Sequence, residues 1–268
     1  MITMNDLTTI SKTLFVPMQG RIYSSEKYPN IFYDKEVLKL KNKLPELNSN
    51  QSEYTFMASA VRSMNIDRYI KEFFTSNPEG IIFELGCGLE TTYYRCDTGK
   101  NKWYALDLPE VINYRKELLP PAKRQILISE SIFNYEWVDK YSEELNNNPI
   151  LFIASGLFHY FEDQAIIELL NQLQKFNNAE IVFDTINKWG MKGIKKYMKE
   201  LGHDEATMYF YVDNASELTR RIGNGAKLLK EEKYYNQTPK NNFQFMTKIS
   251  MIISDLLFMV KMIHIKLS

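Results

Sequence analysis

Two glycines follow an apolar run in the sequence IIFELGCGLETTYYR, which spans Ile81 to Arg95. Gly86 and Gly88 have no Cβ, so backbone N–H groups in this turn can approach a polar or anionic ligand closely. Asp107 stands 21 residues after Gly86, at the end of the next apolar run, WYALD. A carboxylate there can accept hydrogen bonds from both hydroxyls of a ribose. The glycine turn and Asp107 together predict a nucleoside site.

The residues beside the glycines favour one nucleoside ligand over another. The G-x-G-x-x-G pattern of dinucleotide enzymes needs Gly or Ala at position 91, where this chain has Thr91. Glu84, just before the glycines, is unfavourable near a pyrophosphate but compatible with the positive ammonium or sulfonium group of S-adenosylmethionine. The residues therefore favour S-adenosylmethionine as the cofactor, with a nicotinamide cofactor as the alternative.

The elements that must position these residues alternate in the manner of an α/β domain with a mainly parallel sheet. Strands are predicted at 80–85, 102–106, 125–129, 150–154 and 180–184. Helices are predicted at 53–75, 91–96, 109–118, 135–145, 162–176, 190–201 and 216–222. Residues 227–235 predict an antiparallel strand, and the last 24 residues fit a helix followed by the strand MIHIKL. The fold class expected is a Rossmann-like α/β fold with a seven-stranded, mostly parallel sheet, an antiparallel C-terminal hairpin and a helical N-terminal cap.

Composition excludes several kinds of partner. The chain has 268 residues with 33 basic and 33 acidic side chains, so no nucleic-acid partner is predicted. Its two cysteines, Cys87 and Cys96, are too few for a disulfide framework and lack the spacing of a zinc site, so no metal is predicted. The N-terminus carries Asp6 and no basic stretch before an apolar run, which predicts no signal peptide. We expect a cytoplasmic protein.

The amphipathic C-terminal stretch is the remaining candidate for a membrane contact. Its polar face carries only Lys248, Lys261 and Lys266, with Asp255 among them. So few basic residues predict no stable binding to a membrane surface, and the stretch is expected to complete the sheet.

Six segments, in this order and spacing, carry a resemblance to a known family: KTLFVPMQGRIYSSEKYP, residues 53–67, FELGCGLETTYYR, ALDLPEVI, SESIFNYEWVD and LFIASGLFHYF. They resemble the leucine carboxyl methyltransferase family, in particular its bacterial branch, which is similar to polyketide-type O-methyltransferases. The resemblance covers about residues 10 to 235. It implies a class I methyltransferase that uses S-adenosylmethionine, releases S-adenosylhomocysteine and methylates a carboxylate or hydroxyl of a small organic acceptor.

The resemblance also implies a role for individual positions. Arg62 matches the arginine that pairs with the cofactor's carboxylate, Asp107 the acid that holds the ribose, and Ser131 the region near the adenine. The full set of expected cofactor-binding residues is Arg62, Glu84, Gly86, Cys87, Gly88, Asp107, Leu108, Ser131, Ile132, Ser155 and Gly156. The family usually has an acid where Ser155 stands and an Asp where Glu90 stands, so Glu84 is expected to hold the cofactor's ammonium group.

Residues just after the predicted strand 150–154 should face the reacting centre, because ligands bind beyond the carboxyl ends of parallel strands. Methyl transfer from a sulfonium mainly requires positioning and exclusion of water. A carboxylate acceptor needs no base at neutral pH. A hydroxyl acceptor needs one, and His159 is the histidine placed for that role, which makes it the catalytic candidate. The alternative is a buried histidine that is satisfied by a backbone partner.

Three functions remain open from the sequence. An O-methyltransferase of one domain, 1–268, is expected, with a helical cap (1–78), a cofactor-binding core (79–184) and a substrate-side region with the C-terminal strands (185–268). A nicotinamide-dependent oxidoreductase and a catalytically silent nucleoside-binding module are the alternatives. Aromatic residues are expected to form an apolar cap over the acceptor or to pack in the core: Tyr23, Tyr28, Phe32, Tyr33, Tyr209, Phe210 and Tyr211.

Overall fold

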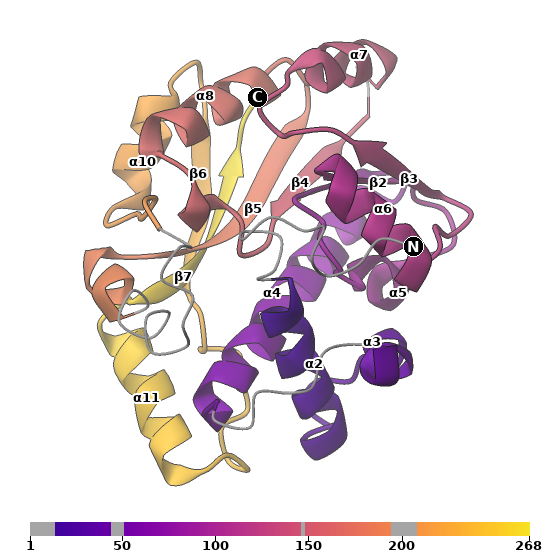
Figure 1. Cartoon of the computed structure of the whole chain (residues 1–268). Coiled ribbons are helices and arrows are strands. Elements are labelled where there is room, and N and C mark those ends of the chain that lie inside the picture. Colours follow the sequence, from indigo (N-terminus) through magenta and orange to yellow (C-terminus); the bar gives the residue numbers. More distant parts are fainter. Residues whose placement is uncertain (1–13, 44–50, 146–147, 194–207) are drawn as a thin grey trace.

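Seven strands pair in one sheet in the computed structural model, which describes residues 14–43, 51–145, 148–193 and 208–268. The strands are β1 (Ile81–Leu85), β2 (Trp103–Asp107), β3 (Gln125–Ser129), β4 (Ile150–Ala154), β5 (Ala179–Ile186), β6 (Lys227–Lys233) and β7 (Val260–Lys266). Their order is β3-β2-β1-β4-β5-β7-β6 (Figure 1). The first five are parallel, and β7 lies antiparallel to both β5 and β6.

The predicted fold class is confirmed, and the strand boundaries differ by only a few residues. The largest difference is in β5, which continues to Ile186 because it pairs with β7 through Ile186↔Val260. β6 and β7 pair directly but are joined through a helix rather than by a tight turn. The predicted helix 190–201 lies partly outside the described residues.

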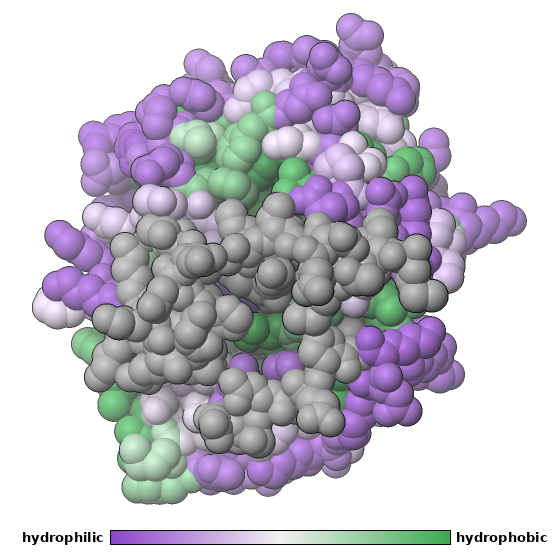
Figure 2. Space-filling model, viewed as in Figure 1, coloured by the Kyte–Doolittle hydropathy of each residue, from purple (hydrophilic) through white to green (hydrophobic). Residues whose placement is uncertain are grey.

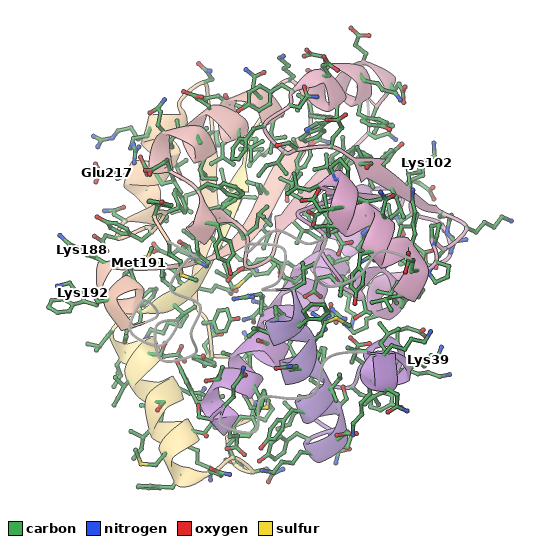
Figure 3. The ribbon with its side chains drawn as sticks, viewed as in Figure 1. Lys39, Lys102, Lys188, Met191, Lys192 and Glu217 are labelled. Atoms are coloured by element: carbon green, nitrogen blue, oxygen red, sulfur yellow. The ribbon has the colours of Figure 1, made fainter. Side chains whose placement is uncertain are left out.

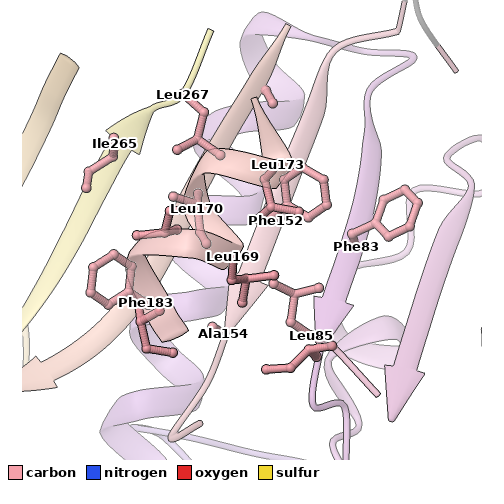
Figure 4. Packing of buried hydrophobic residues seen from close by; sticks show 14 of the residues in the cluster. Phe83, Leu85, Phe152, Ala154, Leu169, Leu170, Leu173, Phe183, Ile265 and Leu267 are labelled. Atoms are coloured by element: carbon pink, nitrogen blue, oxygen red, sulfur yellow. The ribbon is translucent and has the colours of Figure 1, made fainter. Parts of the chain in front are cut away.

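Helices cover both faces of the sheet. They are α5 (Thr92–Cys96), α6 (Pro109–Leu118), α7 (Glu136–Glu144), α8 (Asp163–Leu173), α10 (Ala215–Ile222) and α11 (Phe245–Leu256). Successive strand residues point to opposite faces, so Phe83 joins the core beneath α7 and α8, whereas Ile82 joins the core on the other face. Leu169, Leu170 and Leu173 of α8 pack onto the first of these cores (Figure 4).

The N-terminal part of the chain forms a helical cap, whose longest helix also packs on the face of the sheet that carries Ile82. It contains α2 (Phe15–Lys27), α3 (Lys35–Leu40), the short 3₁₀ helix η2 (Lys41–Lys43) and α4 (Glu53–Ser76). The Ser52 side chain caps α4 by accepting a hydrogen bond from the Thr55 N–H, and Asn77-Pro78 follows its end. α2 packs tightly on α4, because a Cβ on Gly20 would stand 2.5 Å from the Phe56 carbonyl oxygen.

A buried ion network ties the cap to the sheet. Arg95 of α5 binds both carboxylate oxygens of Asp67 in α4, at 2.8 and 2.9 Å, and also reaches Asp34, which caps α3, at 2.9 Å. Thr91, in the turn after the glycines, donates a hydrogen bond to the same Asp34. These contacts fix the cap helices relative to the glycine turn, so the position of the cap depends on buried charge as well as on apolar packing.

Candidate functional site

A cavity of about 1070 Å³ lies between the cap and the carboxyl ends of the parallel strands. Its lining combines residues from the cap, from the turns after β1 to β5 and from the segments around β6 and β7. The residues that line the cavity include Arg21, Tyr54, Arg62, Gly86, Cys87, Gly88, Glu90, Asp107, Leu108, Glu130, Ser131, Ile132, Ser155, Gly156, His159, Tyr160, Asp184, Gly190, Tyr234, Tyr235, Met259 and Val260. All the predicted site residues except Glu84 are therefore brought to one cavity.

The glycine turn after β1 has the conformation that requires glycine. Gly86 and Gly88 have φ angles of 60° and 46°, in the left-handed region. A Cβ on Gly86 would stand 2.5 Å from Leu157, and one on Gly88 would stand 2.7 Å from Leu14. The Cys87 thiol, in contrast, is buried, and burial raises its pKa well above the usual range. Cys87 therefore presents only its backbone to the cavity.

Asp107, at the end of β2, is held in place by two backbone groups. Its Oδ2 accepts a hydrogen bond from the Gly88 N–H at 2.7 Å, and its Oδ1 accepts one from the Leu108 N–H at 2.8 Å. Burial raises the pKa of Asp107 to about 6. Each carboxylate oxygen can accept a further hydrogen bond, so the pair of oxygens suits two adjacent hydroxyl groups of a ribose.

Arg62 projects from α4 into the cavity and pairs with Asp184 of β5. Its Nε lies 3.0 Å from Asp184 Oδ2, and the guanidinium packs against Gly156 so closely that a Cβ there would collide with it. Burial alone would lower the pKa of Arg62, but the Asp184 carboxylate outweighs burial and raises it. The arginine therefore stays positive and is placed to bind an anionic group such as a ligand carboxylate.

Asp184 is a central residue of the site that the sequence reasoning missed. Its Oδ1 accepts the Gly156 N–H at 2.6 Å, and its Oδ2 lies 3.5 Å from His159 Nε2. Burial alone would raise the pKa of Asp184, but Arg62 outweighs it and holds the pKa well below its usual range. The available signal was an acid near the end of an apolar strand, the same signal that identified Asp107.

His159 lies in the 3₁₀ helix η3 (Phe158–Tyr160) and is 4% exposed. Its Nε2 faces Asp184, whereas its buried Nδ1 has no hydrogen-bond partner among the described residues. A buried ring nitrogen without a partner is costly, unless a ligand supplies the missing hydrogen bond. Nδ1 therefore has no backbone partner among the described residues, and the role of His159 as a base stays a prediction.

The structure corrects the role expected for Glu84. The side chain is buried on the face of β1 opposite Phe83 and Leu85, toward α5 and α6, and it does not line the cavity. Burial raises the pKa of Glu84, although Arg115 of α6 opposes this. Arg115 in turn donates a hydrogen bond to the Gly88 carbonyl oxygen at 2.8 Å. Glu84 thus lies behind the glycine turn, outside the lining of the cavity.

Two carboxylates that line the cavity, those of Asp184 and Glu90, lie close enough to Arg62 to raise its pKa. Glu90 forms an ion pair with Arg21 of α2, and Arg21 also donates to the Leu89 carbonyl oxygen at 3.0 Å. Arg21 is a cap residue that no sequence signal singled out, because the chain brings it to the glycine turn only through the packing of α2 on α4.

The aromatic residues expected to cover the acceptor are not those that line the cavity. Tyr23, Tyr28, Phe32 and Phe210 pack in the core, and Tyr33, Tyr209 and Tyr211 are exposed. The cavity is lined instead by Tyr54, Tyr160, Tyr234 and Tyr235. Tyr234 donates a hydrogen bond to the Ala58 carbonyl oxygen at 2.8 Å. Tyr160 follows the predicted strand 150–154, where residues were expected to face the reacting centre. No local pattern predicts that Tyr54 of α4 joins Tyr234 and Tyr235, because α4 and the end of β6 are far apart in the sequence.

Among the described residues, no group of three or more His, Cys, Asp and Glu side chains is arranged to hold a metal ion. Within the same residues, no helix has the length and apolar character needed to cross a bilayer.

Comparisons with known proteins agree on one kind of enzyme. Residues 17–174 match the model of the leucine carboxyl methyltransferase family. The chain is 23% identical over 226 residues to TcmP, the tetracenomycin polyketide synthesis O-methyltransferase of Streptomyces glaucescens, with 81% of this chain and 80% of TcmP covered.

Solved structures share the fold. Magnesium protoporphyrin IX methyltransferase of Synechocystis, crystallised with bound S-adenosylhomocysteine, superposes with a TM-score of 0.54 and 10% identity, covering 92% of this chain and 97% of that one. The plantazolicin methyltransferase BamL, also in complex with S-adenosylhomocysteine, gives a TM-score of 0.54 at 12% identity, covering 97% and 98%.

Proposed function

Because this chain belongs to the leucine carboxyl methyltransferase family, we propose that it transfers a methyl group from S-adenosylmethionine to an oxygen atom of a small organic acceptor. The observation that carries this proposal is the set of charged groups around one cavity: Asp107 beside the glycine turn and Arg62 paired with Asp184. Such a site matches the ribose hydroxyls and the amino-acid end of the cofactor.

The residues present fit S-adenosylmethionine. Asp107 would accept hydrogen bonds from the ribose hydroxyls, and Ser131 and Ile132, which follow β3, would lie against the adenine. Arg62 would bind the carboxylate, and Glu90 and Asp184 are the carboxylates near Arg62 that can face the ammonium group. Bound in this way, the cofactor supplies an electrophilic methyl group on a sulfonium.

The chemistry required of the protein is positioning, exclusion of water and, for a hydroxyl acceptor, removal of one proton. His159 lines the cavity with Nδ1 unpartnered and Nε2 beside Asp184. We infer that His159 accepts the hydroxyl proton at Nδ1 while Asp184 stabilises the resulting imidazolium at Nε2. A carboxylate acceptor would be methylated without this step, so His159 distinguishes the two kinds of acceptor.

Titration calorimetry with S-adenosylhomocysteine tests the proposal. We expect saturable binding to the wild-type chain and a loss of affinity of roughly tenfold to a hundredfold in Arg62→Met, the cost of removing one charge-assisted hydrogen-bonding group. Arg220→Met is the matched control, because the Arg220 side chain is 78% exposed and remote from the cavity lining. Equal loss in both variants would contradict the role given to Arg62.

Two outcomes would support the alternatives instead. Binding of NADH, seen as enhanced fluorescence, with no heat from S-adenosylhomocysteine would favour an oxidoreductase. Tight binding of S-adenosylhomocysteine without methyl transfer to any member of an acceptor panel would favour a silent nucleoside-binding module. The panel should include polyketide phenols and carboxylic acids, because the relative TcmP is named for polyketide methylation. The cytoplasmic location and the single-domain organisation remain predictions.

A further inference from the structure

The helix α11 turns its large apolar side chains outward. Its buried residues are Thr247, Met251 and Ser254, two of which are small and polar. On the outside, six residues are each between 45% and 74% exposed: Phe245, Met246, Ile252, Ile253, Leu256 and Leu257. We call these six residues the α11 patch. It forms the green area at the lower left of Figure 2, where Figure 1 places α11. Exposed apolar groups gathered in this way mark an interaction surface.

Trp189 lies on the segment that meets the C-terminal end of the patch. The Asn187 side-chain amide donates to the Leu257 carbonyl oxygen at 3.0 Å, and the Asn187 N–H donates to the Met259 carbonyl oxygen at 3.0 Å. Trp189 itself is 69% exposed. Of the three tryptophans in the chain it is the exposed one, since Trp103 and Trp137 are buried.

The charged residues that border the patch are mainly lysines. Lys192 lies 5.0 Å from the Trp189 ring, Lys233 lies 5.4 Å from the Phe258 ring, and Lys248 extends from α11 to the Asn241 carbonyl oxygen. Lys188 and Lys192 project outward on the same side of the molecule as α11 (Figure 3). The part of the border that the structure describes is therefore positively charged.

Three acids among the described residues lie near the patch. Glu53 accepts the N–H of Gln244, which precedes Phe245, at 2.7 Å and pairs with Lys27. Asp255, the one acid within α11, faces inward, where it accepts the Tyr235 N–H at 2.9 Å and lies 3.8 Å from Lys240. Asp213 accepts the Lys188 N–H at 2.9 Å. Asp213 keeps its negative charge, because a backbone N–H does not neutralise it, but among the described residues Lys188, Lys192, Lys233 and Lys248 still outnumber this one acid.

Charge decides which partner fits. A second copy of the chain packed patch against patch would bring two lysine borders together, which is unfavourable. A negatively charged surface would instead pair with the lysines while the apolar side chains leave water. A helix with Phe, Leu and Ile on one side and lysines at its border has the composition of helices that lie in a membrane interface. The expectation of no membrane binding counted only lysines of the C-terminal stretch, and Lys188, Lys192 and Lys233 lie outside it. Contrary to that expectation, we propose that the α11 patch and Trp189 dock the protein on the surface of an anionic phospholipid bilayer.

Docking in this orientation has a consequence for the cavity. Gly190, Met259 and Val260 line the cavity, and they belong to the same segments that carry Trp189 and the end of the patch. One wall of the cavity would therefore lie close to the lipid. The arrangement suits an apolar acceptor that partitions into the bilayer, but the docking itself does not depend on the proposed reaction.

Vesicle binding by the full chain tests the proposal. With vesicles of equal parts phosphatidylcholine and phosphatidylglycerol, we expect co-sedimentation and a blue shift of tryptophan fluorescence, which reports on Trp189 because the other two tryptophans are already buried. With pure phosphatidylcholine vesicles, binding should be several-fold weaker, and salt should reduce the difference. Binding that is equal on both vesicles would contradict the role of the lysines.

Two variants distinguish binding through the α11 patch from nonspecific binding of the protein to vesicles. The double variant Leu256→Glu, Leu257→Glu should bind at least tenfold more weakly, because it removes two apolar groups and adds negative charge. Tyr33→Glu is the matched control, since Tyr33 is 54% exposed and lies in the cap, away from α11. Circular dichroism should show that both variants are folded. The proposal would be overturned if the wild-type chain bound to none of the vesicles. It would also be overturned if the wild-type chain formed a dimer that the double variant did not form.

Discussion

The role proposed for Asp107 predicts that cofactor binding depends on pH. Burial raises its pKa to about 6, and the ribose hydroxyls need the ionised carboxylate as their acceptor. Affinity for S-adenosylhomocysteine should therefore be full above pH 6 and fall as the pH decreases through about 6, with a proton released on binding near that value. Calorimetry in buffers of different ionisation enthalpy measures both effects.

Asp107→Asn is the control for that pH dependence. The variant should bind weakly at every pH and lose the transition near pH 6, because an amide does not titrate. Wild-type affinity that stays constant through this range would show that the carboxylate does not contact the ligand.

His159 is the residue whose replacement should affect turnover rather than binding. In His159→Gln we expect kcat for a hydroxyl acceptor to fall by about 10² to 10⁴, the usual contribution of a general base, with the affinity for S-adenosylhomocysteine little changed. His264→Gln is the matched control, because His264 pairs with Glu180 at 2.8 Å and does not line the cavity. An unchanged kcat in His159→Gln would assign methylation to a carboxylate or to another base.

The residue types in the sequence predict many of the residues that line the cavity. Local geometry explains why the expectation for Glu84 is wrong. Asp107 was identified because its position at the end of a strand is visible in the sequence. The expectation that Glu84 faces the ligand is wrong, because the distance of Glu84 from the glycines does not show which face of β1 its side chain occupies. The alternation of Phe83, Glu84 and Leu85 contained that information, since the two apolar neighbours share the opposite face.

At the scale of elements, the contact between α2 and α4 depends on a glycine. In Gly20→Ala, the new Cβ would stand 2.5 Å from a backbone oxygen of α4, so the two helices must move apart. We expect a loss of about 1 to 3 kcal/mol in the free energy of unfolding, as for other overpacked contacts. Denaturant unfolding measures it.

Gly193→Ala provides the comparison, because a Cβ at Gly193 meets no atom within 4 Å. That variant should keep its stability or gain slightly. A Gly20→Ala chain as stable as Gly193→Ala would mean that the helices can separate freely, and the tight packing would then have little energetic weight.

The strands and most helices could be predicted because each carries its own periodic pattern and ends at a turn signal. The boundaries that shifted depend on partners distant in sequence. β5 extends beyond the predicted end because β7 pairs with it, and that pairing is not visible in residues 180–186 alone. The outward apolar face of α11 was missed for a similar reason, because periodicity cannot tell which side of a helix meets the sheet.

For the molecule as a whole, the buried network around Arg95 joins cap to sheet. Replacing Arg95 with Met would leave Asp34 and Asp67 without their shared cation in a buried environment. Breaking such a network typically costs about 3 to 5 kcal/mol. Thermal unfolding of Arg95→Met should show that loss.

The exposed ion pair of Arg221 with Asp163 supplies the reference, since both side chains are more than 40% exposed. Arg221→Met should cost less than about 1 kcal/mol. If the two variants lose similar stability, the buried network is not what holds the cap.

The assembled cavity could be predicted only in outline. Its cofactor side follows from the glycine turn after the predicted strand 80–85 and from Asp107 after the next strand, both of which are visible in the sequence. Arg21, Tyr54 and Tyr234 join it through tertiary packing between segments far apart in the chain, and no spacing rule relates them.

The position of β7 between β5 and β6 has a consequence for synthesis on the ribosome. Translation produces β6 first and then α11, yet among the described strands β6 pairs only with β7. Until residues 260–266 leave the exit tunnel, β6 has no neighbour and the edge of β5 stays open. A chain that lacks residues 260–268 should therefore keep all five parallel strands but remain sensitive to protease around residues 227–233, and the full-length chain should have both edges closed.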